Sequence, residues 1–418
     1  DSNARVYVHE NATSNKSAEF PTLIPYPELE KLLSGLPGHN PDIVITRNDI
    51  AYINYTSGTT GKPNGVEITH RGVLRLVKTN GYFPFSESHV FLQIANLSFD
   101  ASTFEIWGAW LNGHKLVIQA QKEIDLVNLG ALIRLNEITT AFFTTSFFNL
   151  IVTDRCDILK GMKHVIVGGE ALSSKHISQA IENHPTICFY NGYGPTECTT
   201  FSVSYRFSAD PKRYLYEIPI GKPIHETSVY LFDEQMHLLT KVDHAGELYI
   251  GGNGLAKGYL NNPELTNQKF IQHPVNKERI YKTGDLCKWN QHGELVFVSR
   301  VDQQVKIRGF RVEIEEIERK INMHSDIKQC VVIPFKTEFS IELIAVIVRK
   351  NEVLESDLIH YLEKSLPHYM IPSDFIEVNE FTLTKNGKVD RKAIEQFLNE
   401  QKTGIVHPTI QSEDVVLK

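Results

Sequence analysis

The chain has 418 residues, of which 41% are hydrophobic and 22% are charged, and its 43 Lys and Arg against 50 Asp and Glu give a formal net charge of −7. This length and composition are those of a soluble globular protein with room for two or three domains. The sequence contains no basic block that would follow a nucleic-acid backbone and no apolar run of membrane-spanning length, so we expect neither partner.

The spacing of cysteine and histidine argues against further classes of protein. Five cysteines are spread along the chain without a C-x-x-C pair, H-E-x-x-H and G-x-S-x-G are absent, and the 17 histidines form no cluster with cysteine. This pattern predicts neither a disulfide framework, nor a metal cage, nor a Ser-His-Asp hydrolase. It favours a cytoplasmic protein, since no signal peptide is visible. The opening residues, DSNARVYVHE, place a strand-like segment near the start without an initiator Met, and we expect an N-terminally incomplete piece of a longer protein.

The first clear structural pattern is a Gly-rich loop. Residues 49–55 are predicted to form a strand and residues 71–80 a helix, and YTSGTTGKPNGV lies between them. Glycines admit backbone N–H groups close to a ligand, and hydroxyls and a lysine complement negative charge, so the loop favours phosphate. It does not match the P-loop pattern, because Pro63 follows Lys62. An ordinary polar surface turn stays open as an alternative.

Strand and helix candidates then alternate up to about residue 200, which predicts a parallel or mixed sheet with crossover helices. The predicted strands are 114–119, 138–145, 163–169 and 186–194, and the predicted helices are 124–136, 146–154 and 173–184. From about Val203 to Arg300 the pattern becomes rich in strands, including 244–252 and 293–300, which indicates a β-rich subdomain.

The pattern changes again near Asp302. Residues 312–321 place three isoleucines on one helical face, and residues 327–335 and 341–348 are predicted strands. The predicted fold is therefore a large N-terminal α/β region with a β-rich subdomain, plus a small mobile α+β C-terminal domain. The predicted boundaries are 1–301 for the large region, 302–397 for the small domain and 398–418 for a polar linker.

Several motifs occur in a fixed order along the chain. They are YTSGTTGKPNG, FDASTFEIW, NGYGPTE, GELYIGGNGLAKGY, YKTGDL and VDQQVKIRGFRVEIEEIE, followed by LPHYMIP and NGKVDR. This order resembles the adenylate-forming superfamily, specifically the amino-acid-activating adenylation domains of nonribosomal peptide synthetases. The resemblance covers all of the chain except its C-terminal tail, and it implies the adenylate-forming enzyme fold.

The resemblance implies a site for ATP and Mg²⁺. Adenine would stack on Tyr193, Asp285 would accept the ribose hydroxyls, Thr196 would contact the α-phosphate, and Glu197 would bind Mg²⁺ through its carboxylate oxygens. The implied nucleotide-binding residues are Thr56, Ser57, Gly58, Thr59, Thr60, Gly61, Lys62, Gly169, Asn191, Gly192, Tyr193, Asp285 and Arg300. Taken singly, these segments also have plainer interpretations as turns, a turn-capping aspartate and solvated cations.

The implied catalytic residues are Thr196, Glu197, Lys306 and Lys388. Lys388 would bring the anionic carboxylate and α-phosphate together and stabilise the charge of the transition state; alone, its motif would be a hairpin turn with a solvated lysine. Asp302 matches the family's hinge. About it the small domain would turn from an adenylating pose, with Lys388 in the site, to a thioester-forming pose, in which KIRGFR lines the path of phosphopantetheine.

Motif alignment also implies an amino-acid pocket, which resembles pockets that select valine. Its residues are Asp100, Ala101, Phe104, Phe142, Ile166, Gly168, Gly192, Thr200, Phe201 and Lys388. Asp100 would pair with the substrate α-ammonium, since a buried carboxylate without a cation is costly. The phenylalanines are expected to close the floor, and the two glycines to leave room for a branched side chain. Taken singly, each phenylalanine would be interpreted in preference as plain core packing.

The implied function is ATP-dependent activation of a valine-like amino acid as aminoacyl-AMP, followed by transfer to the phosphopantetheine of a carrier domain. We expect that carrier domain directly after the chain and a condensation domain upstream. The chain departs from the family at Asn64, where a lysine is usual. A stand-alone amino-acid or acyl/aryl-CoA ligase and a non-catalytic scaffold fragment stay open as alternatives.

Overall fold

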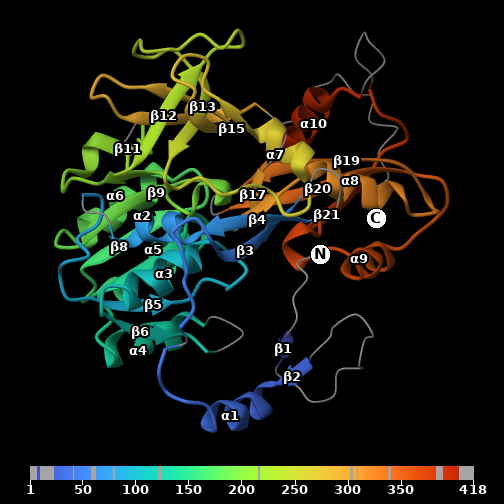
Figure 1. Cartoon of the computed structure of the whole chain (residues 1–418). Coiled ribbons are helices and arrows are strands. Elements are labelled where there is room, and N and C mark those ends of the chain that lie inside the picture. Colours follow the sequence, from blue (N-terminus) through green and yellow to red (C-terminus); the bar gives the residue numbers. More distant parts are fainter. Residues whose placement is uncertain are drawn as a thin grey trace.

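The computed structural model shows a large α/β region and a small C-terminal domain beside it (Figure 1). Among the described residues, no helix combines the length and the apolar character that a membrane crossing requires. The structure describes residues 7–9, 23–40, 42–57, 63–78, 81–120, 125–214, 217–301, 305–307, 309–337, 340–382 and 389–403.

The described part of the chain begins with a small parallel pairing. Strand β1 (Tyr7–His9) pairs with β2 (Leu23–Pro25), and helix α1 (Tyr26–Ser34) follows directly. The described residues therefore include part of the strand expected near the start.

The Gly-rich loop joins two strands, and the prediction of a strand-to-helix connection is wrong. Strand β3 (Ile50–Thr56) pairs antiparallel with β4 (Asn64–Thr69), and helix α2 (His70–Lys78) begins only after β4. Val66 and Ile68 in β4 are fully buried β-branched residues, which suit a strand, and the pairing satisfies the backbone groups of both segments.

The main sheet has seven strands in the described residues, in the order β11-β10-β9-β8-β7-β5-β6. Neighbouring strands from β5 to β9 pair in parallel, as the alternating pattern predicted, and β10 pairs antiparallel with β9. The β-rich subdomain thus begins later than the predicted Val203, because the chain turns back after β9 and buries Val203 in this sheet. The strands are β5 (Val90–Gln93), β6 (Lys115–Ile118), β7 (Thr140–Thr144), β8 (His164–Gly168), β9 (Cys188–Tyr193), β10 (Val203–Arg206) and β11 (Lys222–Pro223).

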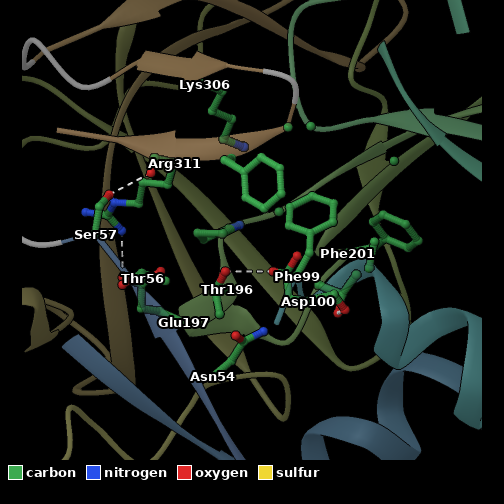
Figure 2. A pocket seen from close by; sticks show the side chains of 18 of the residues that line it. Asn54, Thr56, Ser57, Phe99, Asp100, Thr196, Glu197, Phe201, Lys306 and Arg311 are labelled. Carbon is green, nitrogen blue, oxygen red and sulfur yellow. Dashed lines mark hydrogen bonds and ion pairs between the residues drawn. The ribbon is translucent and has the colours of Figure 1, made fainter. Parts of the chain in front are cut away.

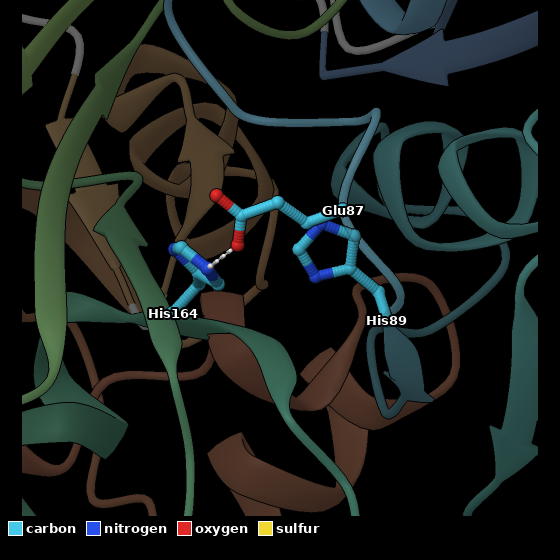
Figure 3. A group of neighbouring side chains, drawn as sticks. All are labelled: Glu87, His89 and His164. Carbon is cyan, nitrogen blue, oxygen red and sulfur yellow. Dashed lines mark ion pairs between the residues drawn. The ribbon is translucent and has the colours of Figure 1, made fainter.

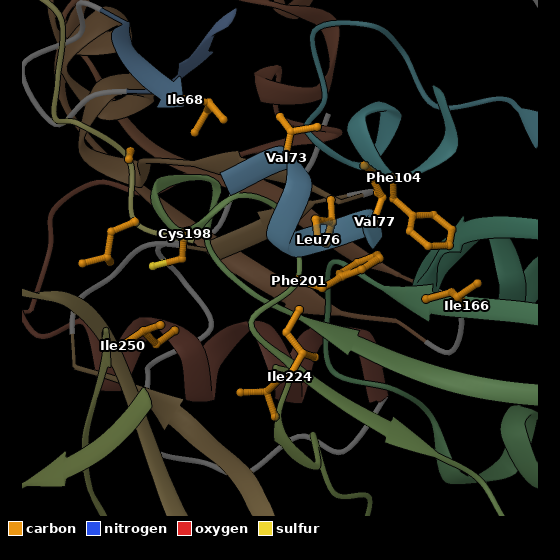
Figure 4. Packing of buried hydrophobic residues seen from close by; sticks show 14 of the residues in the cluster. Ile68, Val73, Leu76, Val77, Phe104, Ile166, Cys198, Phe201, Ile224 and Ile250 are labelled. Atoms are coloured by element: carbon orange, nitrogen blue, oxygen red, sulfur yellow. The ribbon is translucent and has the colours of Figure 1, made fainter. Parts of the chain in front are cut away.

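Helices cover both faces of the main sheet. Phe142, Ile166 and Tyr190 are paired across β7, β8 and β9 and pack with residues of α2 and α3 (Ala101–Trp110), in the core shown in Figure 4. Their chain neighbours, such as Val165 and Phe189, point to the opposite face, because side chains alternate along a strand. There they pack on α4 (Leu126–Leu135), α5 (Thr145–Asp154) and α6 (Ser174–Asn183).

A second, antiparallel sheet forms the predicted β-rich subdomain. Its order is β12-β13-β15-β14, and β16 pairs with β15. Its elements are β12 (Thr227–Phe232), β13 (Gly246–Gly252), α7 (Pro263–Lys269), β14 (Phe270–Gln272), β15 (Arg279–Trp289) and β16 (Leu295–Arg300).

The small domain has its own core. A hairpin of β17 (Val305–Ile307) and β18 (Phe310–Val312) leads into a sheet of order β19-β20-β21. One face of this sheet packs with α8 and α9 and the other with α10, so its buried residues form clusters separate from those of the main sheet. The elements are α8 (Ile314–Asn322), β19 (Ile327–Lys336), β20 (Ile341–Arg349), α9 (Glu355–Glu363), β21 (Asp374–Glu377) and α10 (Arg391–Thr403).

The C-terminal helix corrects the predicted start of the linker. Helix α10 continues to Thr403 and fully buries Leu398, so residues 398–403 belong to the small domain. An apolar residue that completes a core is held in the helix by packing rather than released into a linker. Asp302 and residues 404–418 lie outside the described residues.

Candidate functional site

A cavity of about 110 Å³ lies at the carboxyl ends of the parallel strands, between the β3–β4 hairpin and the β17–β18 hairpin (Figure 2). In open α/β sheets, ligands bind outside the carboxyl ends of the strands. A larger adjoining cavity of about 570 Å³ continues toward the second sheet. The site is therefore built by the large region and closed in part by the small domain.

The structure gathers most of the predicted site residues here. Asn191 and Tyr193 line the larger cavity, while Gly58, Thr59, Thr60, Gly61, Lys62 and Lys388 lie outside the described residues. The predicted residues that line the smaller cavity are Thr56, Ser57, Asp100, Ala101, Phe142, Gly169, Gly192, Thr196, Glu197, Thr200, Phe201, Asp285, Arg300 and Lys306.

A buried arginine that the sequence analysis overlooked holds the loop after β9. Arg75 in α2 is 1% exposed and donates hydrogen bonds to the carbonyl oxygens of Phe201 at 2.6 Å and Cys198 at 2.5 Å. This loop contains Thr199 and Thr200 in left-handed conformations, with φ of 56° and 63°, which persist only when the surroundings fix them. Burial lowers the pKa of Arg75 to about 10, so it remains a cation at neutral pH. An arginine on the apolar face of a predicted helix is the signal that could have found it.

Glu197 is a fully buried carboxylate with a single ion-pair partner among the described residues. Its Oε1 atom lies 2.8 Å from Nη1 of Arg311 and accepts a hydrogen bond from the Tyr259 hydroxyl at 2.6 Å. Burial alone would raise the pKa of Glu197, but Arg311 and Tyr259 together outweigh it and hold the pKa below its usual range. Glu197 is thus an anion in the folded protein.

The donor set around Glu197 fits Mg²⁺. Its Oε2 atom is buried and makes no hydrogen bond of standard geometry among the described residues. The hydroxyl groups of Thr56, Ser57 and Thr196 line the same cavity. A buried carboxylate oxygen with spare acceptor capacity, surrounded by further oxygens, is the ligand environment that this hard cation prefers.

Asp100 places a second buried carboxylate in the cavity. It directly precedes α3, is 8% exposed, and its Oδ2 accepts a hydrogen bond from the Thr196 hydroxyl at 2.7 Å (Figure 2). The Thr200 hydroxyl donates to the backbone carbonyl of the same residue at 2.9 Å. Burial raises the pKa of Asp100, so a cation bound beside it would be favoured. The Thr196 hydroxyl, predicted for the α-phosphate, donates here to Asp100.

Apolar rings form one wall of the cavity. Phe142 and Phe201 line it, with ring centroids 5.8 Å apart, and Phe104 packs behind Phe201 at 5.5 Å. Three of the predicted pocket residues, Phe104, Ile166 and Gly168, lie behind the lining rather than in it.

The expectation that Gly168 and Gly192 leave room for a substrate side chain is wrong. A Cβ on Gly192 would lie 2.7 Å from the Phe201 ring, and one on Gly168 would lie 2.2 Å from the Gly192 carbonyl oxygen. Protein atoms already occupy the space that a side chain at either position would fill. The Phe201 ring lies beside Gly192, and the Gly192 carbonyl oxygen of the neighbouring strand lies beside Gly168. Gly192 therefore shapes the pocket by admitting Phe201.

The predicted nucleotide-binding residues Tyr193, Asp285 and Arg300 form a connected network. Asp285 accepts hydrogen bonds from the Tyr193 hydroxyl and from Nη1 of Arg300, the latter at 2.6 Å. Lys306 lies over the Tyr193 ring, with Nζ 6.0 Å from its centroid. The side-chain amide of Asn191 donates to the Pro219 carbonyl at 2.9 Å. Tyr193, Asp285 and Arg300 are thus held by one another along the boundary between the two cavities, whereas Asn191 is held by the backbone of Pro219.

The β17–β18 hairpin reaches across the site. The Ser57 hydroxyl donates to the Arg311 carbonyl at 2.7 Å, and the Gly309 N–H donates to Oε1 of Glu170 at 2.9 Å. Gly169 has φ of +93° and meets Gly309 so closely that an added Cβ would lie 3.2 Å from the Gly309 Cα. Gly309 and Arg311 of this hairpin thus dock against both the end of β8 and the β3–β4 hairpin.

A second cluster of titratable groups lies at the amino ends of the strands. It contains Glu87, His89 and His164, whose ligand atoms are within 4.8 Å of one another (Figure 3), although the sequence analysis predicted no metal cage. Both ring nitrogens of each histidine already have partners: His89 contacts Thr140 and Pro84, and His164 contacts Glu87 and the Tyr190 hydroxyl. The two histidines are therefore accounted for as core residues whose ring nitrogens all have partners, and Glu87 lies exposed beside them.

Comparisons with known proteins agree with this geometry. Residues 3–260 match the family described as AMP-binding enzyme, and residues 316–388 match the AMP-binding enzyme C-terminal domain. The chain is 42% identical over 350 residues to surfactin synthase subunit 2 of Bacillus subtilis and 40% identical over 377 residues to tyrocidine synthase 3 of Brevibacillus parabrevis. These alignments cover 83% and 90% of this chain but only 10% and 6% of those relatives.

A solved structure shares both the sequence and the fold. Holo-PA1221, an NRPS protein containing adenylation and PCP domains bound to a vinylsulfonamide inhibitor, is 32% identical with a TM-score of 0.83. The match covers 94% of this chain and 67% of that one. The chain therefore belongs to the AMP-binding enzyme family of ligases, as an adenylation domain of the nonribosomal peptide synthetase type.

Proposed function

We propose that the protein activates a small branched aliphatic amino acid, valine first, as aminoacyl-AMP and transfers it to the phosphopantetheine thiol of a carrier domain. In the first step a carboxylate oxygen attacks the α-phosphorus of ATP and pyrophosphate leaves. In the second step the thiolate attacks the activated carbonyl carbon and AMP leaves.

The observation that carries the proposal is a buried carboxylate next to apolar side chains of the pocket wall. Asp100 lies beside Ala101, Phe142 and Phe201, and no ion pair to it is found among the described residues. A substrate α-ammonium would supply the missing cation, while the rings would contact the side chain. This distinguishes an amino acid from a simple acyl substrate, and so favours this function over an acyl-CoA ligase.

The size of the pocket favours a small side chain. Phe201 fills the space beside Gly192, and Phe104 backs Phe201, so the wall cannot recede without repacking the core. A branched aliphatic group would contact Phe142 and Phe201 without requiring a polar partner. A cationic side chain held against the same two rings would lose its hydration without gaining a counter-ion from them.

The remaining roles follow the site's layout. The larger cavity, with Tyr193, Asn191 and Asp285, would hold the adenosine, and the hydroxyls of Ser57 and Thr56 would meet the phosphates. Glu197 would hold Mg²⁺, which neutralises charge on the phosphates. Lys388, outside the described residues, stays our proposed electrostatic catalyst for the first step.

Carrier transfer is supported by the position of the β17–β18 hairpin and by the relatives. The hairpin lies against the site, as expected for the thioester-forming pose after rotation near Asp302. We place the boundary between the large region and the small domain there. The PA1221 structure contains a PCP domain, which makes a carrier domain the expected partner of this chain.

The test is amino-acid-dependent exchange of labelled pyrophosphate into ATP, screened over the twenty amino acids. Valine should give the strongest exchange and isoleucine a weaker one, since a methylene in an apolar pocket changes the free energy by about 1–3 kcal/mol. The matched control is 3-methylbutanoate, which lacks only the α-ammonium of valine and should give none. Preference for an aromatic or charged amino acid would overturn the pocket assignment. A lack of exchange with all twenty amino acids would overturn the proposed function.

A further inference from the structure

The docked β17–β18 hairpin contacts Ser57 and Glu197, which the proposed function assigns to phosphate binding and metal binding. The Ser57 hydroxyl is 2.7 Å from the Arg311 carbonyl oxygen, and Arg311 Nη1 is 2.8 Å from Glu197 Oε1 (Figure 2). Arg311 belongs to β18 of the small domain, whereas Ser57 and Glu197 belong to the large region. One residue therefore connects the pose of the small domain to the ligand sites of the large region.

Glu197 needs a cation in either pose. It is 0% exposed, and Arg311 is its ion-pair partner within the described part of the chain. Removing one partner from a buried ion pair leaves an uncompensated charge, which strongly destabilises the site. When the hairpin moves away, a second cation must replace the guanidinium or water must enter.

We propose that Arg311 and the divalent cation are alternative counter-ions of Glu197, so that the hairpin docks only when the metal has left. Metal bound with nucleotide or pyrophosphate displaces Arg311 and undocks the hairpin. Loss of metal and pyrophosphate returns Glu197 to Arg311. The inference rests on the proposed function for the identity of the cation.

Two observations favour exchange over simultaneous binding. A guanidinium and a dication on one buried carboxylate would lie within a few ångströms of each other, where like charges repel strongly. The Ser57 hydroxyl has one proton to donate, and it cannot serve the Arg311 carbonyl and a phosphate oxygen together. The hairpin and a metal–phosphate ligand thus compete at two separate points.

The first experiment measures binding of Mn²⁺ alone to the full chain by electron paramagnetic resonance. Arg311→Gln should bind Mn²⁺ about tenfold more tightly than the wild type or better, a typical coupling between two sites. Arg311→Lys keeps a cation and should stay near wild type. Arg349→Gln is the matched control, because Arg349 pairs with Glu377 within the small domain at 3.3 Å and does not contact Glu197.

Adding Glu197→Gln to the Arg311→Gln protein should abolish the gain in affinity. Equal or weaker Mn²⁺ binding by Arg311→Gln would overturn the proposal. The readout does not depend on activity, so it separates failure of this inference from failure of amino-acid activation.

The second experiment uses the wild-type protein and needs no variant to fold. Hydrogen exchange of peptides covering β17 and β18 should become faster when Mg²⁺ and inorganic pyrophosphate are added together, because the Gly309 N–H loses its bond to Glu170. Peptides from β19 and β20, inside the small domain, should not change. Unchanged or slower exchange in the hairpin would contradict the proposal.

Discussion

The two ends of the parallel strands gather buried titratable groups but leave them in different states. At the amino end, every ring nitrogen of His89 and His164 contacts a protein atom. At the carboxyl end, Oε2 of Glu197 has no hydrogen bond among the described residues, and Asp100 has a hydroxyl partner but no cation there. Satisfied groups stabilise a core, whereas groups with remaining capacity bind ligands.

The largest expected effect is at Asp100. Asp100→Ala should lower exchange of pyrophosphate by about a hundredfold or more with every amino acid, because the substrate ammonium loses a buried partner. Urea unfolding should show little loss of stability, since the burial that raises the pKa of Asp100 is itself unfavourable. A change of preferred amino acid without a general loss would contradict the role of Asp100 as ammonium anchor.

Substitution of Gly192 tests whether the close approach of Phe201 shapes the pocket at the carboxyl ends of the parallel strands. Gly192→Ala places a Cβ 2.7 Å from Phe201 and should cost about 1–3 kcal/mol in the free energy of unfolding, with weaker amino-acid binding. Gly38→Ala is the control, since its Cβ would meet nothing within 4 Å. If the two variants were equally stable, the packing of Phe201 against Gly192 would not limit the pocket.

For the histidines at the amino ends of the strands, we expect a smaller effect on the free energy of unfolding, and this effect depends on pH. Burial, reinforced by His89, lowers the pKa of His164 to about 4, and burial also lowers the pKa of His89. The unfolded chain therefore takes up protons first as the pH falls. The stability from neutral His164 is complete above about pH 6.5 and is lost toward pH 4, with a slope of at most about 1.4 kcal/mol per pH unit.

Urea midpoints at pH 7 and pH 5 check this expectation. His164→Gln removes the titrating ring, so its stability should change less between these pH values than that of the wild type. Glu87→Gln is the milder companion, because Glu87 is exposed and its contact with His164 is 3.5 Å. Equal pH dependence in the wild type and His164→Gln would show that His164 does not titrate in this range.

Local patterns in the sequence predicted much of the fold. Alternating apolar strands and amphipathic helices predicted β6 to β9 with α4 to α6, and the isoleucines of α8 are buried as expected. The strand β4 was missed because its short sequence, NGVEIT, lies between the Gly-rich loop and the stronger helical pattern of α2. Pairing with β3, a contact across the loop, decided its conformation.

The site shows the same division. The order of motifs, through its resemblance to the adenylation-domain family, singled out Asp100, Glu197 and Asp285 as expected site residues. Only the tertiary structure showed that Arg75 holds the loop after β9, that Gly192 admits Phe201, and that Arg311 pairs with Glu197. Each of these is a contact that motif spacing does not specify. Sequence spacing constrains neighbours along a helix or strand, whereas packing and charge pairing between separate segments are decided when the whole chain folds.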